Sequence, residues 1–178
     1  MNFLAISGSA RATSTNTAML NAVSDIAAPD HTVTVFSGVA DLPVFSPDFE
    51  GGALPATVEA FAKMIRDSDG LIIASPEYVR AIPGGLKNAI DWLVSRDEII
   101  VKPIVLLHAS HRGDDMLAQL RLVLATVSGR FMPDLFLRFS LMNLSARDIA
   151  QTLQDPTFAQ QIKAFLNDFE TRCASQYT

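Results

Sequence analysis

The chain has 178 residues, of which 49% are hydrophobic and only 19% are charged, and its net charge is −5. This length predicts one domain, residues 1–178, with a core large enough to need no disulfide or metal. An acidic chain without a basic run excludes nucleic acid as the main partner. The low charged fraction has two interpretations: a surface covered by a partner subunit, or a chain with few surface lysines.

The chain has one cysteine, Cys173, which excludes an internal disulfide framework and a thiolate metal cluster. This usage is typical of a reducing cytoplasm, where we expect the protein to be found. The first residues have no basic flank, and no apolar run approaches the roughly 20 residues that cross a bilayer. We therefore expect neither a signal peptide nor a membrane-spanning segment.

Apolar runs of strand length alternate with segments of helical period along the chain. The sequence predicts strands at 2–7, 31–36, 70–75, 103–109 and, more weakly, 135–139. It predicts helices at 14–27, 56–66, 86–94, 116–127 and 156–173.

This alternation predicts an α/β fold in which helices cover both faces of a parallel sheet. The strands are almost wholly apolar, as expected where both faces of a sheet are buried. Five β-α units fit a flavodoxin-like three-layer α/β/α sandwich with strand order 2-1-3-4-5. In that order ligands bind outside the carboxyl ends of the first and third strands.

The loop after the first predicted strand carries hydroxyl and amide side chains and one arginine, and it leads into a helix. Hydroxyl groups and free backbone N–H groups at a helix start form an anion site, and Arg11 adds a cationic donor. An alternative is a plain helix cap at Ser14 or Thr15. The Walker lysine and the three glycines of a dinucleotide fingerprint are missing, so the loop predicts a mononucleotide phosphate held by side chains.

The loop after the third predicted strand, 75–92, contains two prolines, two glycines and an aromatic residue. Such a stiff backbone presents N–H and C=O groups to the edge of a flat heterocycle. Tyr78 is either part of this surface or an ordinary exposed aromatic. For Trp92 we favour core packing.

Three motifs resemble those of the NADPH-dependent FMN reductases, a family that includes chromate, quinone and azo reductases. They are Gly8-Ser9-x-Arg11-x-x-Ser14-x-Asn16, then Leu42-Pro43-x-Phe45-x-Pro47-Asp48, and Pro76-Glu77-Tyr78 followed by Ile82-Pro83-Gly84-x-Leu86-Lys87-Asn88-Ala89-Ile90-Asp91-Trp92. The likeness covers about residues 2–125.

The resemblance implies an FMN cofactor and NADPH as co-substrate, with hydride passing to a quinone, flavin, azo dye or metal oxyanion. It implies that the FMN phosphate is held by Ser9, Arg11, Ser14, Thr15 and Asn16. It implies that the isoalloxazine edge lies on the backbone of Pro76, Glu77, Tyr78, Val79 and Arg80, with Ser110 in a third loop that helps cover the ring. The family implies a homodimer or homotetramer.

The flavin carries the chemistry in such an enzyme, so we assign no catalytic acid, base or nucleophile. A hydrolase triad of Ser110, His111 and Asp114 lacks the surrounding nucleophile elbow. We also expect no metal site at His108, His111, Asp114 and Asp115, because carboxylates at a helix start are more often dipole partners.

Three departures from the family pattern concern the loops around the expected flavin ring. Val79 stands where the family commonly has Asn, Arg80 replaces a small or polar residue, and the loop after the fourth strand is shortened, with Asp114 and Asp115 in place of glycines. We expect these carboxylates to disfavour reduced flavin, and Arg80 to offset them or to pair with an NADPH phosphate. The departures leave an alternative open, a non-catalytic electron carrier or assembly module with weakened flavin binding.

Overall fold

The computed structural model describes residues 1–49 and 52–175. Its five parallel strands are β1 (Asn2–Ser7), β2 (Thr32–Phe36), β3 (Gly70–Ala74), β4 (Ile104–His108) and β5 (Phe131–Arg138). They form one sheet in the order β2-β1-β3-β4-β5, as predicted. Between them and after them lie α1 (Thr15–Ala27), η1 (Pro47–Phe49), α2 (Ala56–Arg66), α3 (Gly84–Asp91), α4 (Asp97–Ile100), α5 (Asp114–Val127), α6 (Ala146–Leu153) and α7 (Pro156–Ala174).

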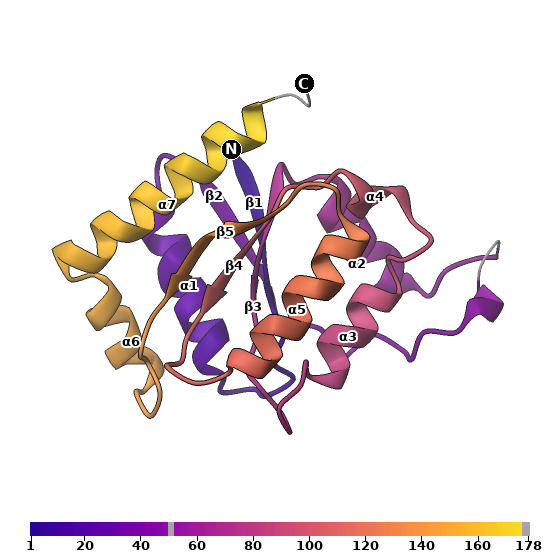
Figure 1. Ribbon diagram of the computed structural model, residues 1–178, viewed down its shortest axis with the longest axis horizontal. Helices are drawn as coiled ribbons and strands as arrows, with labels where there is room; N and C mark the ends of the chain where they lie inside the picture. Colours follow the sequence, from indigo (N-terminus) through magenta and orange to yellow (C-terminus); the bar gives the residue numbers. More distant parts are fainter. Residues whose placement is uncertain (50–51, 176–178) are drawn as a thin grey trace.

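Helices cover both faces of the sheet and form two apolar layers (Figure 1). One layer packs α1, α6 and α7 against the sheet, and the other packs α2, α3, α4 and α5. The central strands are buried along their whole length because both layers cover them. The three-layer flavodoxin-like prediction is therefore confirmed.

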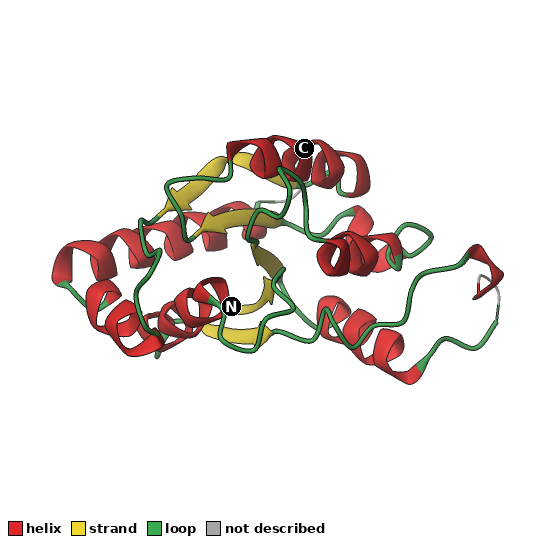
Figure 2. Cartoon of the chain, turned by 90° about the horizontal axis from the view of Figure 1, so that it is seen from below, coloured by secondary structure: helices red, strands yellow, loops and turns green. Residues whose placement is uncertain are grey.

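The segment between β2 and α2 extends away from the sheet and carries η1 (Figure 2). Its base is fixed to α3 by two side chains of the third motif. The Asn88 Oδ1 atom accepts from Phe45 N at 2.8 Å, and Trp92 Nε1 donates to Pro43 O at 2.7 Å. Trp92 is also buried, which confirms the core-packing interpretation of this residue and shows how the second and third motifs are joined.

The structure differs from the predicted elements near the carboxyl end of the chain. Strand β5 begins at Phe131, four residues earlier than predicted, because an edge strand tolerates the exposed Pro133 and Asp134. Helices α4 and α6 were not predicted. Helix α6 has only eight residues, yet it buries Ile149 and Leu153 against the layer formed with α1.

Among the described residues, no helix combines the length and apolar character needed to span a bilayer.

Candidate functional site

The carboxyl ends of β1 and β3 lie side by side, and the two loops that leave them touch at Gly8. Gly8 N donates to Ala74 O at 2.7 Å. A Cβ atom at Gly8 would lie 2.7 Å from both Leu86 Cδ2 and Ser75 Oγ. Only glycine leaves room for this approach, so the first motif and the third motif meet at this residue.

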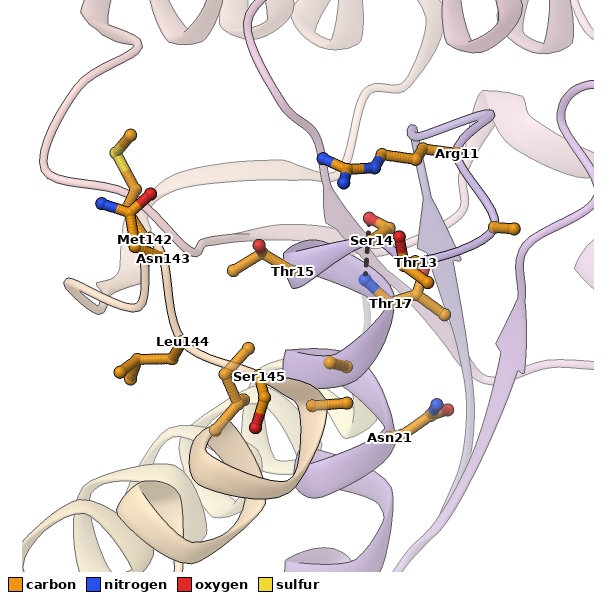
Figure 3. Close-up of a pocket in the computed structure, with 14 residues that line it drawn as sticks. Arg11, Thr13, Ser14, Thr15, Thr17, Asn21, Met142, Asn143, Leu144 and Ser145 are labelled. Atoms are coloured by element: carbon orange, nitrogen blue, oxygen red, sulfur yellow. Dashed lines mark hydrogen bonds between the residues drawn. The ribbon is translucent and has the colours of Figure 1, made fainter.

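A pocket of about 800 Å³ opens beside the amino end of α1 (Figure 3). One wall comes from the β1–α1 loop and α1, and the other from the β5–α6 segment. The lining residues are Arg11, Ala12, Thr13, Ser14, Thr15, Thr17, Ala18, Asn21, Met142, Asn143, Leu144, Ser145, Ala146 and Ile149. Three of the predicted phosphate ligands, Arg11, Ser14 and Thr15, therefore line one pocket.

Polar groups of the β1–α1 loop gather at the start of α1. The Ser14 side chain caps the helix, since its Oγ accepts from Thr17 N at 3.3 Å. The cap interpretation is therefore correct for Ser14, and it leaves the hydroxyl in the pocket wall. Ser9 Oγ accepts from Arg11 N at 3.2 Å, which orders the turn that carries the arginine.

Asn16, also predicted as a ligand, is buried beneath this loop. Within the described part of the chain its Oδ1 atom is buried and has no hydrogen-bond partner. A buried polar atom without a partner is costly, so a donor is expected there when the site is filled. Asn16 itself does not line the pocket, whose arginine and hydroxyl groups fit a ligand that carries a phosphate, as FMN does.

The predicted isoalloxazine platform, Pro76 to Arg80, ends in a two-residue hairpin turn. Tyr78 N donates to Ala81 O at 3.2 Å, and Ala81 N donates to Tyr78 O at 3.0 Å. Val79 and Arg80 both have positive φ, 51° and 60°. Such a turn favours Asn and Gly, so the β-branched Val79 is strained at this position.

Replacing Val79 with Asn should raise the free energy of unfolding by about 1 kcal/mol, because the left-handed backbone conformation is least favourable for a β-branched residue. Chemical denaturation measures this. Val44→Asn is the matched control, since Val44 is 83% exposed, compared with 99% for Val79, and is not among the described residues with positive φ. Equal shifts for the two variants would show that exposure of the valine, and not its backbone, matters.

The two loops that depart from the family pattern bind each other. Arg80 Nε donates to Asp115 Oδ2 at 2.5 Å, and Gln119 Nε2 donates to the Arg80 carbonyl at 2.8 Å. Glu77 Oε2 accepts from Met116 N at 3.1 Å, which ties the platform to the first turn of α5. Tyr78 remains 46% exposed beside this junction.

The carboxylates of the shortened loop are therefore not free charges. Asp115 pairs with Arg80, and Asp114 Oδ1 accepts from Arg138 Nη2 at 2.6 Å. Each carboxylate has a guanidinium partner, which reduces its net charge near the expected ring, and their effect on reduced flavin stays a prediction. Arg80 is likewise engaged with Asp115, which is the offsetting role foreseen for it.

Ser110 lies in the turn after β4. Its Oγ accepts from Arg112 N at 2.9 Å and donates to Met142 Sδ at 2.9 Å. Neither contact is with His111 or Asp114, the other two residues of the triad considered from the sequence. Among the described residues no group of His, Cys, Asp and Glu could hold a metal ion.

The wall formed by Met142 to Ile149 is the part of the pocket that was not predicted from the sequence. The sequence does contain one signal for it, the spacing Ser145-x-x-Asp148. In the structure Ser145 Oγ accepts from Asp148 N at 3.2 Å and caps α6. This is the capping pattern that marks a helix start.

The fold and the site define a flavodoxin-like α/β protein with a donor-rich pocket beside the loop that follows β1. The sequence model of the NADPH-dependent FMN reductase family matches residues 1–140. The chain belongs to this family.

Individual relatives match over part of their length. A quinone reductase of Escherichia coli (strain K12) is 41% identical over 109 residues, which are 60% of this chain and 57% of the relative. A 2-hydroxy-1,4-benzoquinone reductase of Burkholderia sp is 40% identical over 85 residues, 48% of this chain and 45% of the relative. The matches thus span about half the length of these relatives.

A solved structure similar to the whole chain is that of FerB, a flavoenzyme NAD(P)H:(acceptor) oxidoreductase from Paracoccus denitrificans. Its TM-score is 0.76 with 22% sequence identity, covering 96% of this chain and 98% of that chain. At this identity the likeness bears on the fold alone.

Proposed function

We propose that the protein is an FMN-dependent NAD(P)H oxidoreductase that passes hydride from NADPH through bound FMN to a small-molecule acceptor. The family membership supports the class of reaction. The observation that carries the proposal is the pocket at the start of α1, where Arg11, Ser14 and Thr15 present donors beside the switch point of the sheet.

Five residues of the first motif are proposed to bind the FMN phosphate. Arg11 supplies the positive charge, while Ser9, Ser14, Thr15 and Asn16 supply hydroxyl and amide groups. The free N–H groups at the amino end of α1 and the helix dipole favour the same anion. No lysine is needed, because one guanidinium together with these donors matches the charge of one phosphate.

The backbone of Pro76 to Arg80 is proposed to bind the isoalloxazine edge, with Ser110 on the opposite side. The platform is rigid because the Glu77 and Arg80 contacts join it to α5. Rigid backbone donors orient a heterocycle at little entropic cost, which is the contribution that this chain makes to the reaction.

FMN supplies the hydride chemistry when it is bound. The chain's residues hold the cofactor, fix its orientation and leave one face open for two substrates in turn. We therefore assign no side chain as a catalytic acid, base or nucleophile.

A quinone is the proposed acceptor, since the relatives from Escherichia coli and Burkholderia are named as quinone reductases. A flavin, an azo dye or a metal oxyanion remains the wider class. Steady-state NADPH oxidation by the FMN-loaded protein, with and without a benzoquinone, tests the proposal. We expect turnover that requires both. FMN that binds tightly but is not reduced by NADPH would instead support the electron-carrier alternative.

We also propose that residues 1–178 act as one cytoplasmic FMN-binding domain that assembles as a homodimer or homotetramer. Support for assembly comes from exposed apolar side chains after α3 and around the end of α4, where Val94, Ile100 and Val101 are 60%, 51% and 61% exposed. The single cysteine supports the reducing compartment.

Light scattering at micromolar concentration should give at least twice the chain mass of 19.3 kDa. Val94→Lys with Val101→Lys should lower that mass if these side chains lie at the interface. A mass near that of one chain for the wild type would contradict the proposed assembly.

A further inference from the structure

The last residue of β4, His108, lies under the turn that leads to α5. Its imidazole is buried, with 1% of the residue exposed. The Nε2 atom lies 2.5 Å from Arg112 O, and only a protonated Nε2 can donate to a carbonyl. Nε2 therefore carries the hydrogen in the neutral ring.

The turn is built closely around this ring. Gly113 has φ 103°, and a Cβ atom at Gly113 would lie 2.8 Å from His108 Nε2. Glycine is therefore required there both by conformation and by space. The next residue, Asp114, begins α5, so the ring packs directly beneath the residue that precedes this helix.

The Arg112 carbonyl accepts from two donors. His108 Nε2 is one, and Arg138 Nη2 at 3.3 Å is the other. Arg138 also pairs with Asp114, which compensates part of its charge. The same turn holds Ser110 through the Arg112 N–H group, and Ser110 is one of the residues proposed to face the flavin.

We propose that His108 is a positioning residue of the flavin site: its neutral imidazole holds the Ser110–Gly113 turn closed, and protonation of the ring opens it. This inference rests on the proposed FMN site, whereas the closure of the turn itself does not.

The charges around the ring determine the direction of the pH effect. Burial lowers the pKa of His108 below its ordinary value of 6.5, and Arg138 on β5 lowers it further. The carbonyl of Arg112, the backbone of Ser75 and the carboxylate of Asp114 on α5 act in the opposite direction. Glu77 of the platform also approaches, with its Cβ 3.7 Å from the position of a Gly113 Cβ, but its carboxylate accepts from Met116 N.

A charged ring can still donate to Arg112 O. It is buried from solvent, however, and it lies near a second cationic donor to the same carbonyl, Arg138. Above pH 7 the ring is neutral whether the turn is open or closed, so the closed turn has no penalty. As pH falls through about 6.5, the open turn binds a proton that the closed turn resists. The closed turn is therefore destabilised relative to the open turn on the acidic side.

FMN affinity measured between pH 5.5 and pH 8 tests the proposal with three variants. His108→Gln keeps a donor for Arg112 O without a titrating group, His108→Leu removes the donor, and His111→Gln removes the neighbouring exposed histidine. The FMN phosphate titrates near pH 6 in every protein, so each variant is compared with the wild type at the same pH.

At pH 8 we expect wild type, His108→Gln and His111→Gln to agree within about twofold, and His108→Leu to bind more weakly. At pH 5.5 the wild type and His111→Gln should lose about threefold to tenfold more affinity than His108→Gln, the scale of half to one pKa unit. Equal pH profiles for wild type and His108→Gln would overturn the proposal.

Amide hydrogen exchange of the flavin-free wild type separates this proposal from the proposed function. Exchange at Arg112, whose N–H donates to Ser110 Oγ, and at Leu117, whose N–H donates to Gly113 O, should speed up below pH 6.5 relative to amides of α7 after correction for intrinsic rates. If FMN does not bind but this change is seen, the role of His108 in closing the turn is supported and the cofactor assignment fails. Unchanged relative exchange would overturn the proposed role of His108 in closing the turn, whether or not FMN binds.

Discussion

Replacing Arg11 with alanine should weaken FMN binding by about 1.5–3 kcal/mol, the range for a hydrogen bond to a charged group. That range corresponds to roughly 10-fold to 150-fold in the dissociation constant. The Arg11 side chain extends over the pocket from the β1–α1 loop, so its guanidinium is available to a phosphate at the start of α1 (Figure 3).

Riboflavin provides the internal control, because it lacks the phosphate that Arg11 is proposed to bind. Its affinity should change by less than about twofold in Arg11→Ala, well under 1 kcal/mol. Lys163→Ala removes the same charge from the exposed surface of α7 and should affect neither ligand. An equal loss for FMN and riboflavin in Arg11→Ala would refute the phosphate assignment. Fluorescence quenching of the flavin measures both affinities.

Phe169→Ala should lower the free energy of unfolding by about 3–5 kcal/mol, the cost of truncating a fully buried aromatic side chain. The Phe169 ring stacks on Phe3 with centroids 4.7 Å apart and covers Gly70, where a Cβ would lie 2.6 Å from Phe169 Cζ. It therefore joins α7 to β1 and β3 at the amino end of the sheet.

Two further variants test this packing by chemical denaturation. Phe158→Ala, on the same helix but only partly buried, should cost clearly less. Gly70→Ala should destabilise the wild type by overpacking but should partly fill the space left by Phe169→Ala. Costs that add in the double variant would mean that Gly70 and Phe169 do not share this contact.

The strand order and both helical layers could be predicted from the sequence, because the long elements have strong periodicity. The central strands β3 and β4 are short apolar runs, and β-α alternation leaves few topologies for them. Helix α6 was missed although its two buried residues, Ile149 and Leu153, have the i, i+4 spacing of a helix. Its capping pair, Ser145 and Asp148, was the available evidence.

The first motif also illustrates how much of the site local sequence defines. The cluster Arg11, Ser14 and Thr15 is contiguous along the chain, so its gathering in one pocket follows from the β1–α1 loop itself. The opposite wall at Met142 to Ser145 comes from a segment that is distant in sequence and that the family match does not reach. Only tertiary packing of α6 against α1 brings the two walls together.

The departures from the family pattern could be seen in the sequence, but their meaning could not. Taken singly, Arg80 and Asp115 are charges added near the expected flavin. The structure shows that they pair with each other across two loops. A pair between residues 35 positions apart leaves no periodic or local signal, so it could not be predicted from the sequence.

The central claim is that the pocket at the start of α1 binds the FMN phosphate. Titration of the purified protein with FMN at pH 8, monitored by absorbance and flavin fluorescence, tests this claim most directly. We expect saturable binding of one FMN for each chain, and weaker binding of riboflavin because the pocket at the start of α1 then holds no phosphate. An absence of saturable FMN binding, or equal affinity for FMN and riboflavin, would contradict the account of this site.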